Sequence, residues 1–200
     1  MSVKLIIFDL SNVCFNNEET PFFKKFAERH GLDSDKVEEV FYELAPQAEM
    51  GEETGKKALR HMLKKFGIEE DPDEMIEEMI DYKEAKPKTL EFAQHLRKNY
   101  KVIYFTNYNR DFWKAIEERF DMDKYFDEGL VSYQAKSRKP LPGGFKLLMD
   151  RYNVKPEETI FLDDKEGNLK HAKEMDINTI HFKSLDQLKE EMRKLGVKTD

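Results

Sequence analysis

Three short apolar runs in this 200-residue chain each end in polar or acidic residues. Residues 5–8 run into Asp9, residues 102–105 into Thr106 and Asn107, and residues 159–162 into Asp163 and Asp164. Apolar runs of this length, separated by helical stretches, are typical of buried parallel strands. In such sheets, ligands bind beyond the carboxyl ends of the strands. The sequence therefore predicts that these polar side chains, together with the loop residue Lys139, converge on one site.

The rest of the chain alternates between helical and extended patterns. Helical spacing of apolar residues covers 21–30, 34–44, 55–66, 72–83, 90–98, 111–119, 143–152, 168–175 and 185–195. Strands are expected at 4–8, 102–105, 129–132, 159–162 and 179–182. From residue 87 onward the two patterns alternate, which predicts an α/β fold with a doubly wound, mainly parallel, Rossmann-like sheet.

Charge divides the chain into two parts. Residues 16–86 hold 20 acidic and 11 basic side chains, whereas the remainder holds 21 acidic and 23 basic ones. The first part also contains no convincing strand. We therefore expect an α/β core formed by residues 1–15 and 87–200, and an all-helical cap formed by residues 16–86 that serves as a lid.

Composition excludes several classes of function. The net charge of −7 argues against nucleic acid as the main partner, and no apolar run approaches the length of a membrane span. The lone cysteine, Cys14, fits a reducing compartment. Because the first residues lead directly into a strand, we expect no signal peptide and a cytoplasmic protein. The sequence leaves the choice between monomer and homodimer open.

Four ordered motifs give the chain a family resemblance. They are residues 8–13 (FDLSNV), 105–107 (FTN), 138–140 (RKP) and 162–164 (LDD), the last followed by Asn168. Together they resemble the haloacid dehalogenase superfamily of aspartate-nucleophile phosphohydrolases, in the branch with a helical cap after the first strand. The resemblance covers the whole length, and it implies hydrolysis of a small phosphorylated metabolite.

The resemblance also implies a role for each residue of the site. Asp9 would be the nucleophile that forms an aspartyl-phosphate. Asp9, Asp163, Asp164 and the main-chain carbonyl of Ser11 would hold Mg²⁺, and elementary electrostatics agrees, because three clustered carboxylates require a cation. Side chains expected to contact the phosphoryl group are those of Thr106, Asn107 and Lys139. Supporting roles around these groups are expected for Asn12 and Asn168.

Ser11 departs from the family pattern. Phosphatases of this family usually carry a second aspartate at this position, which protonates the leaving group and later activates water. Loss of a positioned general acid typically costs about 10²- to 10⁴-fold in rate. The segment is similar to the Asp-Leu-Gly-Asn-Val variant of bacterial sugar-1-phosphatases, which also lacks that aspartate.

Three consequences of Ser11 stay open at this point. The protein is a phosphatase for esters with good leaving groups, or a degenerate phosphate-binding protein, or a catalyst of a different reaction. The acidic pair Asp163 and Asp164 argues against carbon–halogen cleavage, because dehalogenases of the family need no metal. We favour a Mg²⁺-dependent phosphatase.

Overall fold

The computed structural model describes residues 2–16 and 19–199. Within these residues, one sheet contains β1 (Leu5–Phe8), β2 (Lys101–Thr106), β3 (Glu128–Val131), β4 (Thr159–Asp163) and β5 (Asn178–His181). The spatial order is β3-β2-β1-β4-β5, and all pairings are parallel. β1 lies between β2 and β4, so the winding of the sheet changes direction there. This confirms the predicted doubly wound α/β fold, with its switch point at the end of β1.

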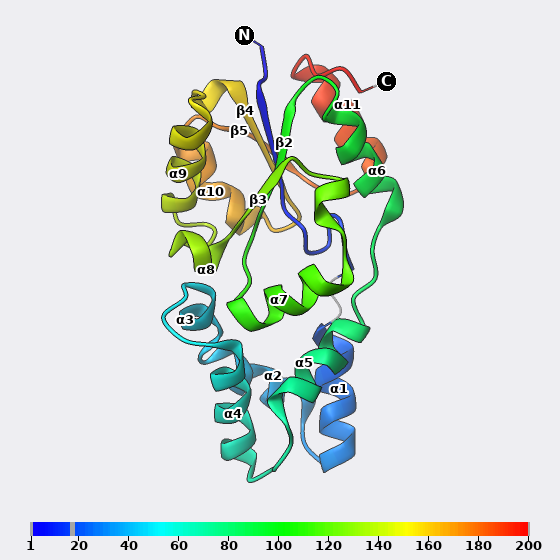
Figure 1. Ribbon diagram of the computed structural model, residues 1–200, viewed down its shortest axis with the longest axis vertical. Helices are drawn as coiled ribbons and strands as arrows, with labels where there is room; N and C mark the ends of the chain where they lie inside the picture. The colour runs from blue at the N-terminus through cyan, green and yellow to red at the C-terminus, as the bar shows by residue number, and fades with distance from the viewer. Residues whose placement is uncertain (1, 17–18, 200) are drawn as a thin grey trace.

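Helices cover both faces of the sheet (Figure 1). α9 (Gly143–Tyr152) and α10 (Glu166–Glu174) lie on one face, and α6 (Pro87–Leu96) and α11 (Leu185–Lys194) lie on the other. Every residue of β1 is buried, because alternate side chains enter the two cores on opposite faces. A strand buried on both faces carries an uninterrupted apolar run, which is why the sequence pattern identified it.

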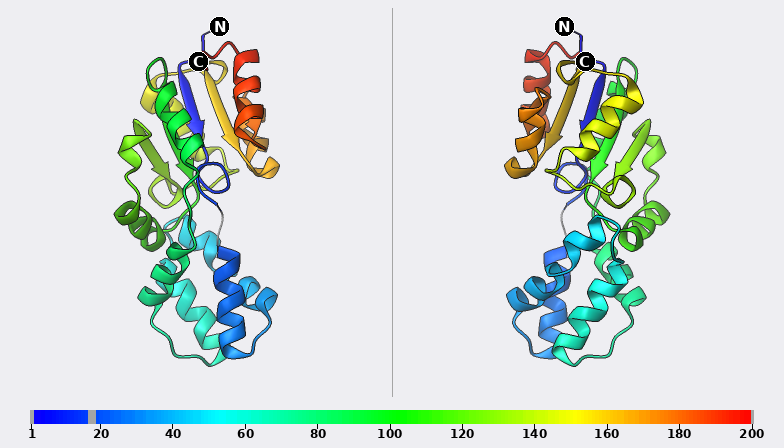
Figure 2. Two further views of the ribbon diagram at one scale, coloured as in Figure 1. Left: turned by 90° about the vertical axis from the view of Figure 1, so that its right-hand side faces the viewer. Right: turned by 90° about the vertical axis from the view of Figure 1, so that its left-hand side faces the viewer.

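Within the described residues, the first five helices after β1 lie beyond the carboxyl end of the sheet (Figure 2). They are α1 (Glu19–His30), α2 (Ser34–Tyr42), α3 (Ala45–Glu49), α4 (Gly55–Phe66) and α5 (Pro72–Asp81). α4 and α5 pack against α7 (Arg110–Arg119), which follows β2. The exact division of the chain at residues 15/16 and 86/87 stays a prediction. None of the described helices is long and apolar enough to cross a membrane.

The two connections between the sheet and these five helices run side by side. Phe15 and Ala85 form an antiparallel bridge, and the main-chain N–H of Asn16 donates to the carbonyl of Glu84 at 2.9 Å. The N–H of Lys86 donates in turn to the carbonyl of Cys14 at 2.7 Å. We call the returning connection, residues 83–86, the hinge segment.

Short elements account for most of the differences from the sequence prediction, and the bounds of the longer elements differ from the expected ones by at most about three residues. The sequence pattern did not predict α3, α8 (Ser132–Ala135), or the 3₁₀ turns η1 (Met122–Lys124) and η2 (Pro156–Glu158). Residue 132, expected in a strand, opens α8 instead. Elements of three to five residues contain too few turns to produce a helical periodicity.

Candidate active site

The loop after β1 places Asp9 at the switch point of the sheet. The main-chain N–H of Asp9 donates to the carbonyl of Leu162 on β4 at 2.9 Å, which fixes where the aspartate leaves the strand. Asn12 adopts a left-handed conformation with φ of 58°, which asparagine tolerates better than most residues. Its side-chain amide donates to Asp164 Oδ2 at 2.9 Å. The tight loop thereby ties the first and fourth predicted motifs together.

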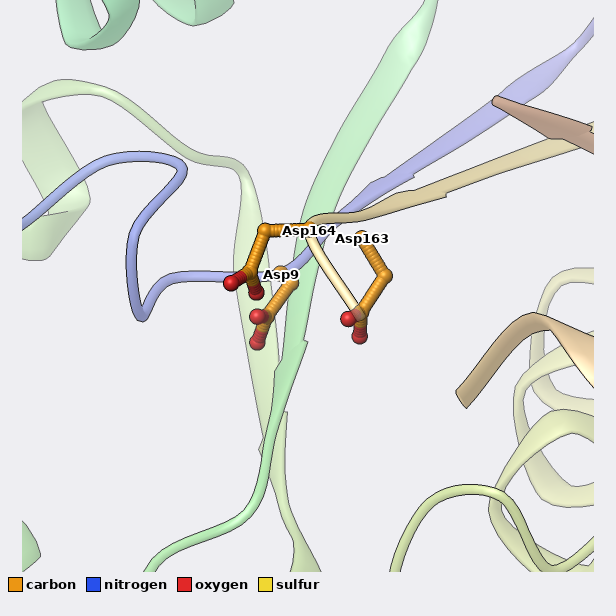
Figure 3. A group of neighbouring side chains, drawn as sticks. All are labelled: Asp9, Asp163 and Asp164. Carbon is orange, nitrogen blue, oxygen red and sulfur yellow. The ribbon is translucent and has the colours of Figure 1, made fainter. Parts of the chain in front are cut away.

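Three carboxylates gather at this point (Figure 3). One oxygen each from Asp9, Asp163 and Asp164 lies within 4.8 Å of the other two. Asp9 is 4% exposed and Asp163 is fully buried. Three carboxylates at this spacing repel one another strongly away from water, so the cluster requires cationic partners.

Lys139 supplies one of these cationic partners. Its Nζ lies 2.6 Å from Asp9 Oδ1 and 2.6 Å from Asp163 Oδ2, and the residue is 2% exposed. Burial by itself would lower the pKa of Lys139, but the two carboxylates outweigh burial and raise this pKa above its ordinary value. The lysine is therefore held as an ammonium ion between them.

Asn107 positions the lysine loop. Its side-chain oxygen accepts from the main-chain N–H of Lys139 at 2.8 Å, and its side-chain nitrogen donates to the Lys139 carbonyl at 3.1 Å. Both polar ends of the amide are thus engaged with one residue. The expected role of Asn107 in substrate binding stays a prediction, whereas its contact with the lysine loop is direct.

The two neighbouring aspartates at the end of β4 have different partners. Asp163 accepts from Lys139 Nζ, from the main-chain N–H of Lys165 and, at both oxygens, from the Asn168 side chain. Asp164 accepts from Asn12, but its buried Oδ1 has no hydrogen-bond partner among the described residues. Asp163 is therefore saturated with donors, and Asp164 keeps an oxygen for another ligand.

Burial raises the pKa of Asp9 from its ordinary 3.8 to about 7. The neighbouring Lys139 ammonium opposes this rise, and the Asp163 carboxylate adds to it. Asp9 in the metal-free protein therefore gains and loses its proton near neutral pH. A further cation beside it would favour the ionised form.

A cavity of about 230 Å³ opens above Asp9. Its floor carries Asp9, Lys139 and the 1%-exposed Thr106, whose hydroxyl has no hydrogen-bond partner within the described part of the chain. Helical residues from beyond the sheet form the opposite wall: Phe41, Tyr42, Ala45 and Glu49. The cavity therefore combines a polar floor with a largely apolar wall.

An ion pair joins the two sides of the cavity. Arg138 Nε lies 2.6 Å from a carboxylate oxygen of Glu49, the last residue of α3. The sequence did not predict that these two residues form an ion pair. Asn109, which also lines the cavity, caps α7 by accepting from the N–H of Phe112 at 3.1 Å.

Ser11 faces the cavity and contacts a second hydroxyl. Its Oγ lies 2.9 Å from Tyr108 Oη, and Tyr108 in turn accepts a hydrogen bond of 2.9 Å from Lys83 Nζ. Sequence reasoning did not identify Lys83 as part of the site. Tyr108 directly follows the 105–107 motif, which is a weak signal, whereas Lys83 lies far from every motif in the sequence.

A haloacid dehalogenase-like hydrolase family model matches residues 3–176, so the chain belongs to this family, as its motifs predicted. It is 25% identical to a phosphorylated carbohydrates phosphatase of Thermotoga maritima, over 90% of this chain and 84% of the relative. It is 26% identical to a D-ribitol-5-phosphate phosphatase of Bacteroides thetaiotaomicron, over 88% of this chain and 90% of the relative. The crystal structure of a family enzyme from Bacteroides thetaiotaomicron in a magnesium complex superimposes with a TM-score of 0.81 at 26% identity, covering 92% of this chain and 96% of that chain. The prediction of a hydrolase of this family is confirmed.

Proposed function

We propose that the protein is a Mg²⁺-dependent phosphatase that hydrolyses small phosphorylated sugars or polyols through an Asp9 phosphoenzyme. The observation that carries this proposal is the clustering of Asp9, Asp163 and Asp164, the first two paired with Lys139, beneath an open cavity at the switch point of the sheet. Nucleophile, counter-ions and substrate space are thereby brought to one place.

The residues present fit a magnesium ion. Carboxylate oxygens are the ligands that this ion prefers, and Asp164 Oδ1 is a buried oxygen without a partner among the described residues. We assign Asp9, Asp164 and the main-chain carbonyl of Ser11 as direct ligands. Because donors already saturate Asp163, we assign it mainly to holding Lys139 in place. When bound, Mg²⁺ would neutralise negative charge on the phosphoryl oxygens.

Each side chain on the cavity floor has a chemical role in this proposal. Asp9 attacks phosphorus, the P–O bond to the leaving group breaks, and water later hydrolyses the aspartyl-phosphate. Lys139 favours the ionised form of Asp9 and attracts a phosphoryl oxygen. The Thr106 hydroxyl, buried and without a partner in the described structure, donates to another phosphoryl oxygen.

The upper part of the cavity favours a small leaving group without a second charge. A volume of about 230 Å³ is below the ~300–1,000 Å³ of pockets that bind drug-sized ligands. Arg138, one of the basic residues that line the cavity, is already paired with Glu49. Two relatives are named for phosphorylated carbohydrates and for D-ribitol 5-phosphate, which are substrates of this kind.

The test is hydrolysis of p-nitrophenyl phosphate with and without Mg²⁺. We expect turnover that requires the ion and is lost in Asp9→Asn, with Lys146→Met, at an exposed position on α9, as the control. A panel of phosphorylated sugars and polyols then ranks substrates by kcat/KM. Turnover that persists in Asp9→Asn would contradict the proposed nucleophile.

A second function has one observation in its favour. Ser11 stands where an acid would be expected, so a protein that binds phosphate and turns it over hardly at all is the alternative. Phosphate binding measured by calorimetry, without hydrolysis of any ester, would support it. If the phosphatase is active, Ser11→Asp should increase turnover most for alkyl phosphates, because their alkoxides need a proton.

A further inference from the structure

Three polar residues from separate segments meet beside the cavity, and two of them, Ser11 and Tyr108, line it. Ser11 follows the nucleophile, Tyr108 follows β2, and Lys83 belongs to the hinge segment. Tyr108 Oη lies 2.9 Å from Ser11 Oγ and 2.9 Å from Lys83 Nζ. Tyr108 is 6% exposed and Lys83 is 7% exposed, so both polar groups are largely withdrawn from water. A lysine is rarely buried to this degree without a specific partner.

The hydroxyls of Ser11 and Tyr108 have one proton more than their mutual hydrogen bond uses. A lysine ammonium only donates, so the Tyr108 oxygen accepts from Lys83. The two hydroxyls of Ser11 and Tyr108 carry two protons, and their mutual hydrogen bond uses one of them. The second proton is left for an acceptor outside the pair. Because Ser11 and Tyr108 both line the cavity, a bound substrate can supply that acceptor.

The Lys83 ammonium also makes this hydroxyl a stronger hydrogen-bond donor. A hydroxyl that accepts from a cation becomes a stronger donor, and the effect passes along a chain of hydrogen bonds. The favoured direction therefore runs from Lys83 to Tyr108, from Tyr108 to Ser11, and from Ser11 into the cavity. Lys83 acts through Tyr108, so it is a positioning residue.

We propose that the Ser11–Tyr108 hydroxyl pair, oriented by Lys83, donates a hydrogen bond to the ester oxygen of the leaving group. The proposal rests on the phosphatase function, in which the phosphoryl group is held at Asp9 and Thr106 and the ester oxygen faces the remaining cavity. The pair stabilises charge on the departing oxygen by a hydrogen bond and transfers no proton. It thus supplies part of what a carboxylic acid at position 11 would provide.

The experiment compares two esters across a set of variants. p-Nitrophenyl phosphate releases a phenolate that needs little support, whereas glycerol phosphate releases a poor alkoxide leaving group. We expect Tyr108→Phe to lower kcat for glycerol phosphate about 10- to 100-fold, and for p-nitrophenyl phosphate by less than about 3-fold. KM should change little for either ester, because the bond forms mainly as charge develops.

Lys83 is tested through the same readout. Lys83→Met should reproduce the ester-dependent loss of kcat, and Lys83→Arg, which restores a cationic donor, should recover most of it. Ser11→Ala combined with Tyr108→Phe should cost little more than the larger single loss, because the two hydroxyls act as a unit. Tyr125→Phe and Lys88→Met, outside the cavity, serve as matched controls.

The outcomes separate the two proposals. Equal losses on both esters would indicate a merely structural role for the network and overturn this inference, as would unchanged kcat in Tyr108→Phe. In either case Asp9-dependent turnover of p-nitrophenyl phosphate would leave the phosphatase function standing. If the wild-type protein hydrolysed neither ester, both proposals would fall.

Discussion

Replacing Lys139 with methionine removes the ammonium that two buried carboxylates share. The lysine is 2% exposed, and its Nζ lies 2.6 Å from oxygens of both Asp9 and Asp163. At an effective dielectric of 20, each contact is a gross attraction of roughly 6 kcal/mol, much of which offsets the desolvation of the charges. Methionine conserves most of the side-chain volume, so the change is one of charge. We expect the free energy of unfolding without metal at pH 8 to fall by about 3–5 kcal/mol.

The assay is thermal melting followed by circular dichroism in EDTA. For a chain of this length, the expected loss corresponds to a decrease in Tm of roughly 6–20 °C. Lys146→Met, at an exposed position, should melt within about 2 °C of the wild type. Excess Mg²⁺ should reduce the deficit of Lys139→Met, because the ion neutralises the same carboxylates. A variant that melts with the wild type in EDTA, or a deficit that Mg²⁺ leaves unchanged, would refute this reasoning.

Three further predictions concern other parts of the molecule. Because the pKa of Asp9 is raised from 3.8 to about 7, the folded state holds a proton that the unfolded state releases. The free energy of unfolding of the metal-free protein should therefore decline as pH rises from about 4 to about 7. Urea titrations should show a smaller decline in Asp9→Asn. Glu49→Gln weakens the ion pair with Arg138 across the cavity and should raise KM about 3- to 10-fold while changing kcat little, measured with the best substrate of the panel. Gly144→Ala would place a Cβ 2.3 Å from a phenylalanine ring of β2 and should cost about 1–3 kcal/mol in urea unfolding, whereas Gly167→Ala, where a Cβ meets nothing within 4 Å, should cost nothing.

The sheet and the floor of the site were readable from the sequence for one physical reason. Strands buried on both faces carry continuous apolar runs, and parallel strands bring their carboxyl ends to one edge. Asp9, Thr106 and Asp164 each follow such a run, so their convergence followed from the fold class. The structure places all three at the same edge of the sheet, beneath the cavity or beside it.

The rest of the site depends on contacts that leave no local pattern. α3 and α8 are too short to show periodicity, so the Glu49–Arg138 pair could not be anticipated. Lys83 lies 72 residues beyond Ser11 in the sequence, in a charged stretch typical of solvated surface. Only the pairing of the two chain connections brings it to Tyr108. The position of a hinge residue relative to a site is a property of the tertiary structure.

Hydrogen bonds link the hinge segment to two neighbouring residues of the loop after β1, Ser11 and Asn12. Lys83 reaches Ser11 through Tyr108, and Lys86 Nζ donates to the main-chain carbonyl of Asn12 at 2.5 Å. Asn12 in turn holds Asp164. A rotation of the five helices about their connections would displace both lysines, and it would thereby remove the cation from the Ser11 side of the cavity and loosen the Asp164 side. We therefore expect the proposed leaving-group donor to be complete only when the five helices stand over the sheet as they do here.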